Sequence, residues 1–161
     1  MNEIVIPRFG ELLAPYLSAV PSEAYPFLLS ELERTAAARY REWAEQLPKY
    51  RSGLTKCADA EDKIANRAAA LFPASQNHQD LIAKIIPNAK AAYYAAFEPY
   101  HPAEQVYIQS KAERQGAGAW QRLKETYPEK ADALDALSAL ELESADYLDG
   151  IMKDLLKNVA A

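Results

Sequence analysis

The second half of this sequence resembles the first half when the two are aligned with a shift of 80 residues. No gap is needed between residues 30–68 and 110–148, and nine of these 39 positions are identical. The identities include Pro48 with Pro128, and two pairs of glutamates that are each separated by 28 residues. A repeat of this length predicts two like supersecondary units in one chain.

The composition predicts that both units are helical. The chain has only five glycines, is rich in alanine, leucine, glutamate and lysine, and has no run of alternating β-branched residues. Prolines then mark helix ends, because they begin or terminate helices. We expect a kink at Pro15, a break at Pro87 and a turn at Ser52 and Gly53. The expected helices are 9–19, 26–47, 54–72, 79–86, 88–97, 102–127 and 131–158.

These elements predict an all-α fold in a single domain, residues 1–161. It comprises an N-terminal extension with a short helix (1–25), a first helical hairpin (26–73), a long helical crossover (74–101) and a second hairpin (102–158). Two like hairpins joined by a long crossover are typical of an up-down four-helix bundle. A chain of 161 residues is long enough to bury a core without disulfides or structural metals.

Charge and hydropathy exclude several classes of partner. The formal net charge of −5 argues against nucleic acid, and no apolar run has the length of a membrane span. Residues 1–7 lack the features of a signal peptide, so we expect a cytoplasmic protein. The single cysteine, Cys57, rules out an internal disulfide and is expected to be a small buried side chain.

Four glutamates lie on the inner apolar stripes of the four long helices, one on each helix. A carboxylate in an apolar core must be protonated, paired with a cation, hydrogen-bonded or bound to a metal ion. Small residues beside them, such as Ala36 and Gly116, leave room for another group. The candidate metal ligands are therefore Glu33, Glu61, Glu113 and Glu141.

The spacing of Glu33, Ala36, Tyr40 and Ala44 resembles the first helix of rubrerythrin-like members of the ferritin-like superfamily. In that family the first and third helices each provide a glutamate, the second and fourth each provide a Glu-x-x-His pair, and together they hold two irons. The resemblance spans residues 26–155 as an architecture. It implies a ferritin-like bundle in which Glu33 and Glu113 are the single glutamates. Glu61 and Glu141 would be the glutamates of the two Glu-x-x-His pairs.

Both expected histidines are replaced in this sequence, by Ile64 and by Ser144. The leading hypothesis is therefore a degenerate, iron-free member without a cofactor, which serves as a structural or partner-binding module, with a homodimer or an unknown protein partner possible. Its glutamates would be held by each other, by water or by the side chains Tyr40, Ser144, Arg34, Arg67 or Arg114.

The alternative hypothesis is an oxidoreductase or metal-storage protein with a carboxylate-only di-metal site. The four glutamates would be its ligands, with Tyr40 and Ser144 beside them. Such a hard oxygen set suits Mn, Mg, Ca or weakly held Fe better than Zn or Cu, and Fe or Mn is the expected di-metal cofactor.

The remaining chemically active residues predict no further site. His78 and His101 lie near expected helix starts and are expected to be solvated or capping. Three serines lie within expected helices without a nucleophile-elbow motif, which argues against a hydrolase; they are Ser30, Ser110 and Ser138. Tyrosines of the crossover region are expected to pack against the bundle, with a ligand pocket or partner surface as the alternative; they are Tyr93, Tyr94, Tyr100 and Tyr107.

Overall fold

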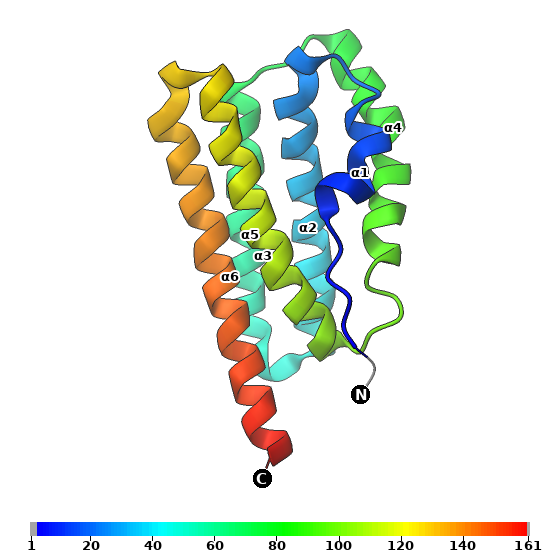
Figure 1. Ribbon diagram of the computed structural model, residues 1–161, viewed down its shortest axis with the longest axis vertical. Coiled ribbons are helices and arrows are strands. Elements are labelled where there is room, and N and C mark those ends of the chain that lie inside the picture. The colour runs from blue at the N-terminus through cyan, green and yellow to red at the C-terminus, as the bar shows by residue number, and fades with distance from the viewer. Residues whose placement is uncertain (1–2, 161) are drawn as a thin grey trace.

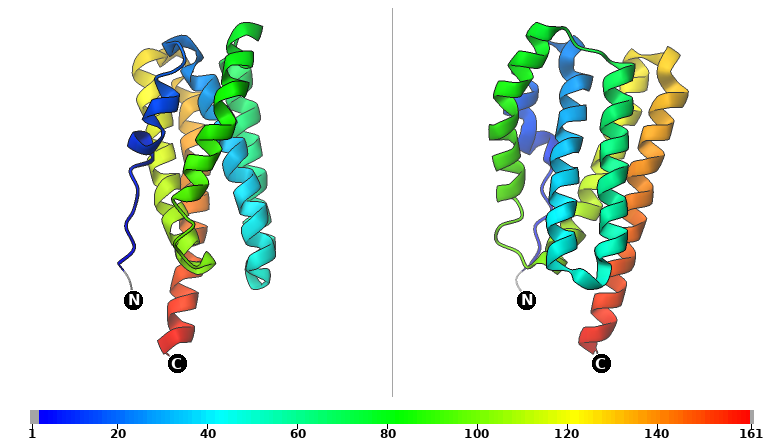
Figure 2. Two further views of the ribbon diagram at one scale, coloured as in Figure 1. Left: turned by 90° about the vertical axis from the view of Figure 1, so that its right-hand side faces the viewer. Right: turned by 180° about the vertical axis from the view of Figure 1, so that it is seen from behind.

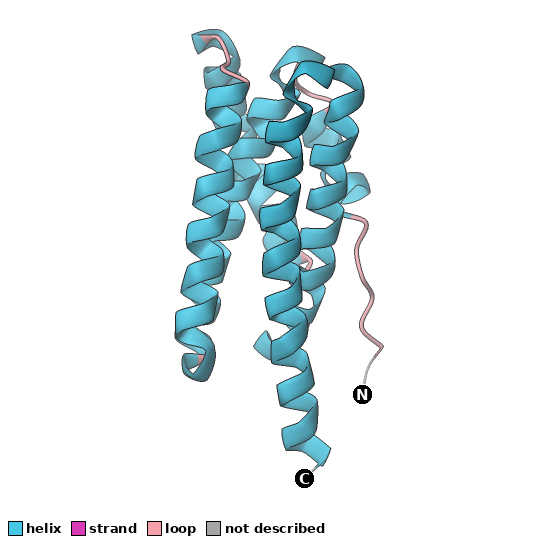
Figure 3. Cartoon of the chain, turned by 90° about the vertical axis from the view of Figure 1, so that its left-hand side faces the viewer, coloured by secondary structure: helices cyan, strands magenta, loops and turns pink. Residues whose placement is uncertain are grey.

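A computed structural model describes residues 3–160, with side chains through residue 157, so residues 1, 2 and 161 of the expected domain lie outside it. Every regular element in the described part is helical, and no strand occurs there (Figure 3). The α-helices are α1 (Phe9–Leu17), α2 (Tyr25–Gln46), α3 (Arg51–Leu71), α4 (Gln76–Ala95), α5 (Pro102–Thr126) and α6 (Ala131–Ala160). Short 3-10 helices occupy Ser22–Ala24, Pro48–Tyr50 and Pro128–Lys130.

The repeat predicted from the sequence appears as two hairpins with equivalent boundaries. Helix α2 ends at Gln46 and α5 ends 80 residues later at Thr126, and each is followed by a 3-10 helix that begins at a proline. The prediction of a turn at Ser52 and Gly53 was wrong, because both residues lie inside α3. The chain reverses before these residues, within the 3-10 helix Pro48–Tyr50. Pro48 has no backbone N–H to donate, so α2 ends just before it.

The two hairpins lie side by side (Figures 1 and 2). Helix α3 packs against α6, whereas α2 and α5 contact each other at few points. Helix α1 packs on α4 and also contacts α5, while α4 contacts α2. The N-terminal segment and the crossover therefore cover the side of the bundle on which α2 and α5 lie apart.

The crossover contains one continuous helix, so the break expected at Pro87 was wrong. Proline removes one backbone hydrogen bond and crowds the preceding turn, which usually interrupts a helix. Here α4 buries Ile82 before the proline and Ala89 and Tyr93 after it, so tertiary packing holds both sides together. The His101 side chain accepts a hydrogen bond from the backbone N–H of Ala103, as expected for a capping residue.

Three apolar clusters fill the interior of the described structure, and the glutamates lie between two of them. On α3, Leu54 and Cys57 belong to one cluster, and Ile64 belongs to the other. Glu61 lies between these two levels. Cys57 is buried, as predicted. Within the described residues, no helix combines the length and the apolar character that a membrane span requires.

Candidate metal centre

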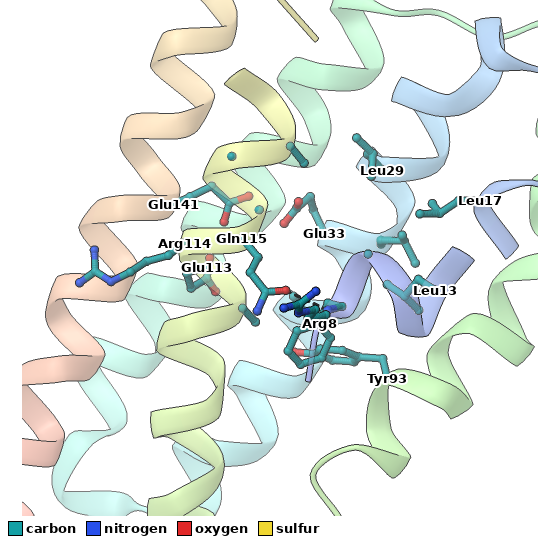
Figure 4. A pocket seen from close by; sticks show the side chains of 18 of the residues that line it. Arg8, Leu13, Leu17, Leu29, Glu33, Tyr93, Glu113, Arg114, Gln115 and Glu141 are labelled. Atoms are coloured by element: carbon teal, nitrogen blue, oxygen red, sulfur yellow. Dashed lines mark hydrogen bonds between the residues drawn. The ribbon is translucent and has the colours of Figure 1, made fainter. Parts of the chain in front are cut away.

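The four candidate glutamates converge in the interior from four different helices, as their spacing predicted. Carboxylate oxygens of Glu33, Glu61 and Glu141 lie within 4.8 Å of one another. The fourth, Glu113, is near enough to raise the pKa of each of the other three by charge repulsion. Figure 4 shows Glu33, Glu113 and Glu141 pointing toward one space. Three are almost inaccessible to solvent: Glu61 (0% exposed), Glu141 (1%) and Glu113 (2%).

Glu61 is the least satisfied group of the cluster. Both of its carboxylate oxygens are buried, and neither has a hydrogen-bond partner among the described residues. A buried carboxylate without donors is strongly destabilising when ionised. Glu61 must therefore be protonated in the protein alone, or it must be neutralised by a bound cation.

Glu113 is held in place by neighbouring donors. Its Oε1 atom accepts hydrogen bonds from the Tyr40 hydroxyl at 2.5 Å and from Gln109 Nε2 at 2.7 Å. The Tyr93 hydroxyl in turn donates to Gln109 Oε1 at 2.6 Å. Tyr40 therefore contacts a glutamate as the sequence suggested, and two further residues extend the network toward α4.

Glu141 is positioned by a tryptophan and by a glycine of α5. The Trp120 indole N–H donates to Glu141 Oε1 at 3.0 Å. A Cβ atom on Gly116 would lie only 2.9 Å from the same oxygen, so the glycine leaves the space that this carboxylate occupies. The Trp120 indole and the space beside Gly116 therefore together hold the Glu141 carboxylate in the cluster.

The other side chains considered from the sequence do not neutralise the cluster. Arg34 bonds to Glu31 and Asn66, and Arg114 bonds to Asp146 and Asp149. Neither these two nor Arg67 makes an ion pair with the four glutamates, so the idea of arginine counterions was wrong. Ser144 is buried beside the Cys57 thiol and makes no hydrogen bond to the described glutamates. Ile64 is also fully buried.

The electrostatics of the cluster favour protons or a cation. Burial is the main cause that raises the pKa of Glu61 and of Glu141 well above the usual value, and repulsion from the neighbouring carboxylates raises both further. Burial is also the main cause that raises the pKa of Glu33, and a hydrogen bond with Glu61, which forms only when the two carboxyls share a proton, opposes this rise. The carboxyls therefore ionise together only if positive charge enters the site.

The raised pKa values predict how stability depends on pH in chelator-treated protein. Between the usual glutamate pKa of 4.5 and the raised values, the folded state binds more protons than the unfolded state. Stability is then fully present below this range and is lost as the pH rises through it. We expect urea denaturation to give a free energy of unfolding at least about 1 kcal/mol lower at pH 8 than at pH 5. A higher value at pH 8 would contradict the proton-sharing cluster.

A cavity of about 640 Å³ reaches the cluster from the side covered by α1. Glu33, Glu113 and Glu141 line it, together with residues of α1, α2 and α5 (Figure 4). Glu33 is the partly exposed member of the cluster and faces this space. Of the tyrosines considered in the crossover region, Tyr93 lines the cavity, so both packing and pocket lining apply to it.

Sequence reasoning missed three contributions to the site: Gln109, the Trp120 indole as a donor, and Tyr93 as a member of the hydrogen-bond network. The room beside Gly116 was expected, and the Glu141 carboxylate fills it. The repeat contained one usable signal, because Trp120 occupies the position equivalent to Tyr40. Both donate to a glutamate, but Tyr40 reaches Glu113 on α5 and Trp120 reaches Glu141 on α6. The duplication could therefore have indicated a second donor at Trp120, but not which glutamate accepts from it.

Comparison of the chain with models of protein families, with curated proteins and with solved structures finds no match. The ferritin-like, rubrerythrin-like resemblance accordingly stays a prediction that rests on the residues quoted for it.

Proposed function

We propose that this protein is a metal-binding helical bundle that holds a hard cation through Glu33, Glu61 and Glu141, with Glu113 completing the site. The observation that carries this proposal is Glu61, whose two buried oxygens have no hydrogen-bond partner in the described part of the chain while two other carboxylates approach it. Buried charges in proteins are paired or coordinate metals. A cation between these carboxylates would satisfy the oxygens that the described protein groups leave unpartnered.

The chemistry of the donor set limits which metals suit the site. Carboxylate oxygens favour Mg²⁺, Ca²⁺, Mn²⁺ and Fe²⁺, while imidazole and thiolate favour Zn²⁺ and Cu. Ile64 supplies no ligand atom, and Cys57 has its pKa raised to about 12 by burial, which disfavours a thiolate. We therefore favour Mn²⁺ or Fe²⁺ in a ferritin-like arrangement of the two hairpins. Such an ion would supply one-electron redox chemistry, as expected of an oxidoreductase or metal-storage protein.

One observation supports the metal-free alternative, a degenerate bundle with a structural or partner-binding role. Glu113 and Glu141 already accept hydrogen bonds from protein donors. Glu61, Glu33 and Glu141 also have raised pKa values, so protons shared between the carboxyls would neutralise the cluster without metal. The two proposals differ in whether the protein retains a cation at neutral pH.

Equilibrium dialysis against Mn²⁺, followed by element analysis, tests the metal proposal. We expect the parent protein to retain at least one Mn²⁺ per chain. The Gly116→Ala variant should bind Mn²⁺ about tenfold more weakly, because the new Cβ displaces Glu141 from its place beside Trp120.

Gly150→Ala is the matched control, because a Cβ at Gly150 meets no atom within 4 Å. It makes the same chemical change in a helix and should leave Mn²⁺ retention unaltered. Retention of no Mn²⁺ by the parent protein would favour the metal-free alternative. Equal retention by both glycine variants would remove Glu141 from the set of ligands.

A further inference from the structure

The cavity beside the candidate metal centre has glutamates at its inner end and apolar side chains along its walls. Half of the side chains that line it are apolar or aromatic, including Phe9, Leu13, Leu17, Leu29, Leu32 and Ala112. Its volume of about 640 Å³ falls in the range of small-molecule sites. An ion and its waters would use only the carboxylate end, so the apolar walls suit a molecule with a hydrocarbon body.

Arg122 provides a positive charge at the cavity and has no acidic partner within 4.0 Å among the described residues. A Cβ atom on Gly118 would lie 3.3 Å from Arg122 Nη1, so this side chain lies back along α5 over another lining residue. Burial raises the pKa of Tyr25, which lines the cavity from α2, and the charge of Arg122 opposes this rise. The other two lining arginines are engaged, Arg8 with Glu11 and Arg114 with Asp146 and Asp149.

The charges of the cavity are separated along its length. On α5 the guanidinium of Arg122 lies beside Gly118, which follows Glu113 by a helical rise of about 7.5 Å, and on α2 Glu33 follows Tyr25 by about 12 Å. One end of the cavity therefore has carboxylates, and the other has a guanidinium beside a phenol. An anionic group is repelled at the first end and attracted at the second.

We propose that this cavity binds an amphiphilic monocarboxylate, with its head group on Arg122 and its hydrocarbon chain extending along α1 toward the glutamates. A guanidinium binds a carboxylate through charge-assisted hydrogen bonds. The apolar side chains of α1, α2 and α5 enclose the chain. This binding needs no metal ion, so it does not depend on the function proposed for the glutamates.

Isothermal titration calorimetry of chelator-treated protein with decanoate tests the inference. We expect saturable binding of one decanoate per chain. Acetate, which has the same head group without the chain, should bind at least about tenfold more weakly. Decyltrimethylammonium, which has an equally long chain and the opposite charge, should also bind at least about tenfold more weakly. All ligands are kept below their critical micelle concentrations.

The variant Arg122→Leu identifies the head-group site. It should weaken decanoate binding about tenfold or more, because it removes the cation and keeps an apolar side chain. Arg67→Leu is the matched control, since Arg67 is exposed on α3 and does not line the cavity. Circular dichroism before each titration verifies that both variants remain helical.

A repeat of the titrations with Mn²⁺ separates this inference from the metal proposal. An unchanged dissociation constant for decanoate, with the same loss in Arg122→Leu, supports a head group on the arginine. Absence of decanoate binding, equal binding by Arg122→Leu, or binding only in Mn²⁺-loaded protein would overturn the inference. If the protein retains no Mn²⁺ and still binds decanoate through Arg122, the metal proposal fails and this one stands.

Discussion

Added Mn²⁺ is expected to raise the thermal midpoint of metal-free protein by about 5–10 °C when free Mn²⁺ is about 100 times its dissociation constant. A ligand that binds only the folded state stabilises it by mass action, which corresponds to about 2.7 kcal/mol at this concentration. The physical source is the relief of repulsion between Glu33, Glu61 and Glu141. Differential scanning calorimetry at neutral pH measures the effect.

The control for this experiment is excess chelator, which should return the midpoint to its metal-free value. Zn²⁺ should stabilise the protein less than Mn²⁺ at equal free concentration, because the cluster offers only carboxylate oxygens. The size of the shift should grow with the logarithm of free Mn²⁺ once the site is saturated. A midpoint that does not respond to Mn²⁺ or Fe²⁺ would support a proton-sharing cluster and the metal-free role.

The substitution Glu61→Gln is expected to act in opposite directions on the metal-free and metal-loaded protein. Without metal it should raise the free energy of unfolding by about 1–3 kcal/mol near pH 8, because it removes a buried group with no partner. The new amide also donates to carboxylates that lie nearby, on Glu33 and Glu141. With Mn²⁺ present, the metal-dependent rise in the midpoint should largely disappear.

Glu125→Gln is the matched control, because Glu125 is exposed on α5 and forms no ion pair in the described structure. It should change neither the metal-free midpoint nor the response to Mn²⁺. Thermal unfolding of the three proteins with chelator and with Mn²⁺ separates the two effects. If Glu61→Gln kept the full response to Mn²⁺, then Glu61 would not be a ligand and the proposed site would lose its central member.

The sequence predicted the repeated architecture well because its signals are local. Pro48 and Pro128 restrict the backbone wherever they occur, and the apolar spacing selects the helix face that is buried. The same local reasoning failed at Pro87, where burial of Ile82 and Tyr93 keeps α4 continuous. It also failed at Gly53, which lies within α3, where a Cβ atom would overlap the ring of Tyr147 from α6. Packing against distant segments therefore holds α4 together at Pro87, and it explains why position 53 inside α3 is a glycine.

Local patterns in the sequence were enough to predict that helices form, that two hairpins repeat and that one glutamate of each hairpin helix points inward. They were enough because helical periodicity assigns a side chain to a face without reference to the partner helix. The hydrogen-bond partners of each carboxylate depend instead on how the helices pack against one another. Glu113 meets Tyr40 and Gln109, while Glu61 meets no donor among the described residues.

The tertiary structure also decided where positive charge lies. Arg34 and Arg114 follow Glu33 and Glu113 directly in the chain, yet both side chains bond outside the cluster, because adjacent residues on a helix point in different directions. The cavity that joins the glutamates to Arg122 exists because α1 covers a side on which α2 and α5 barely touch. Such a space depends on how three separate helices pack, and no local pattern in the sequence encodes it.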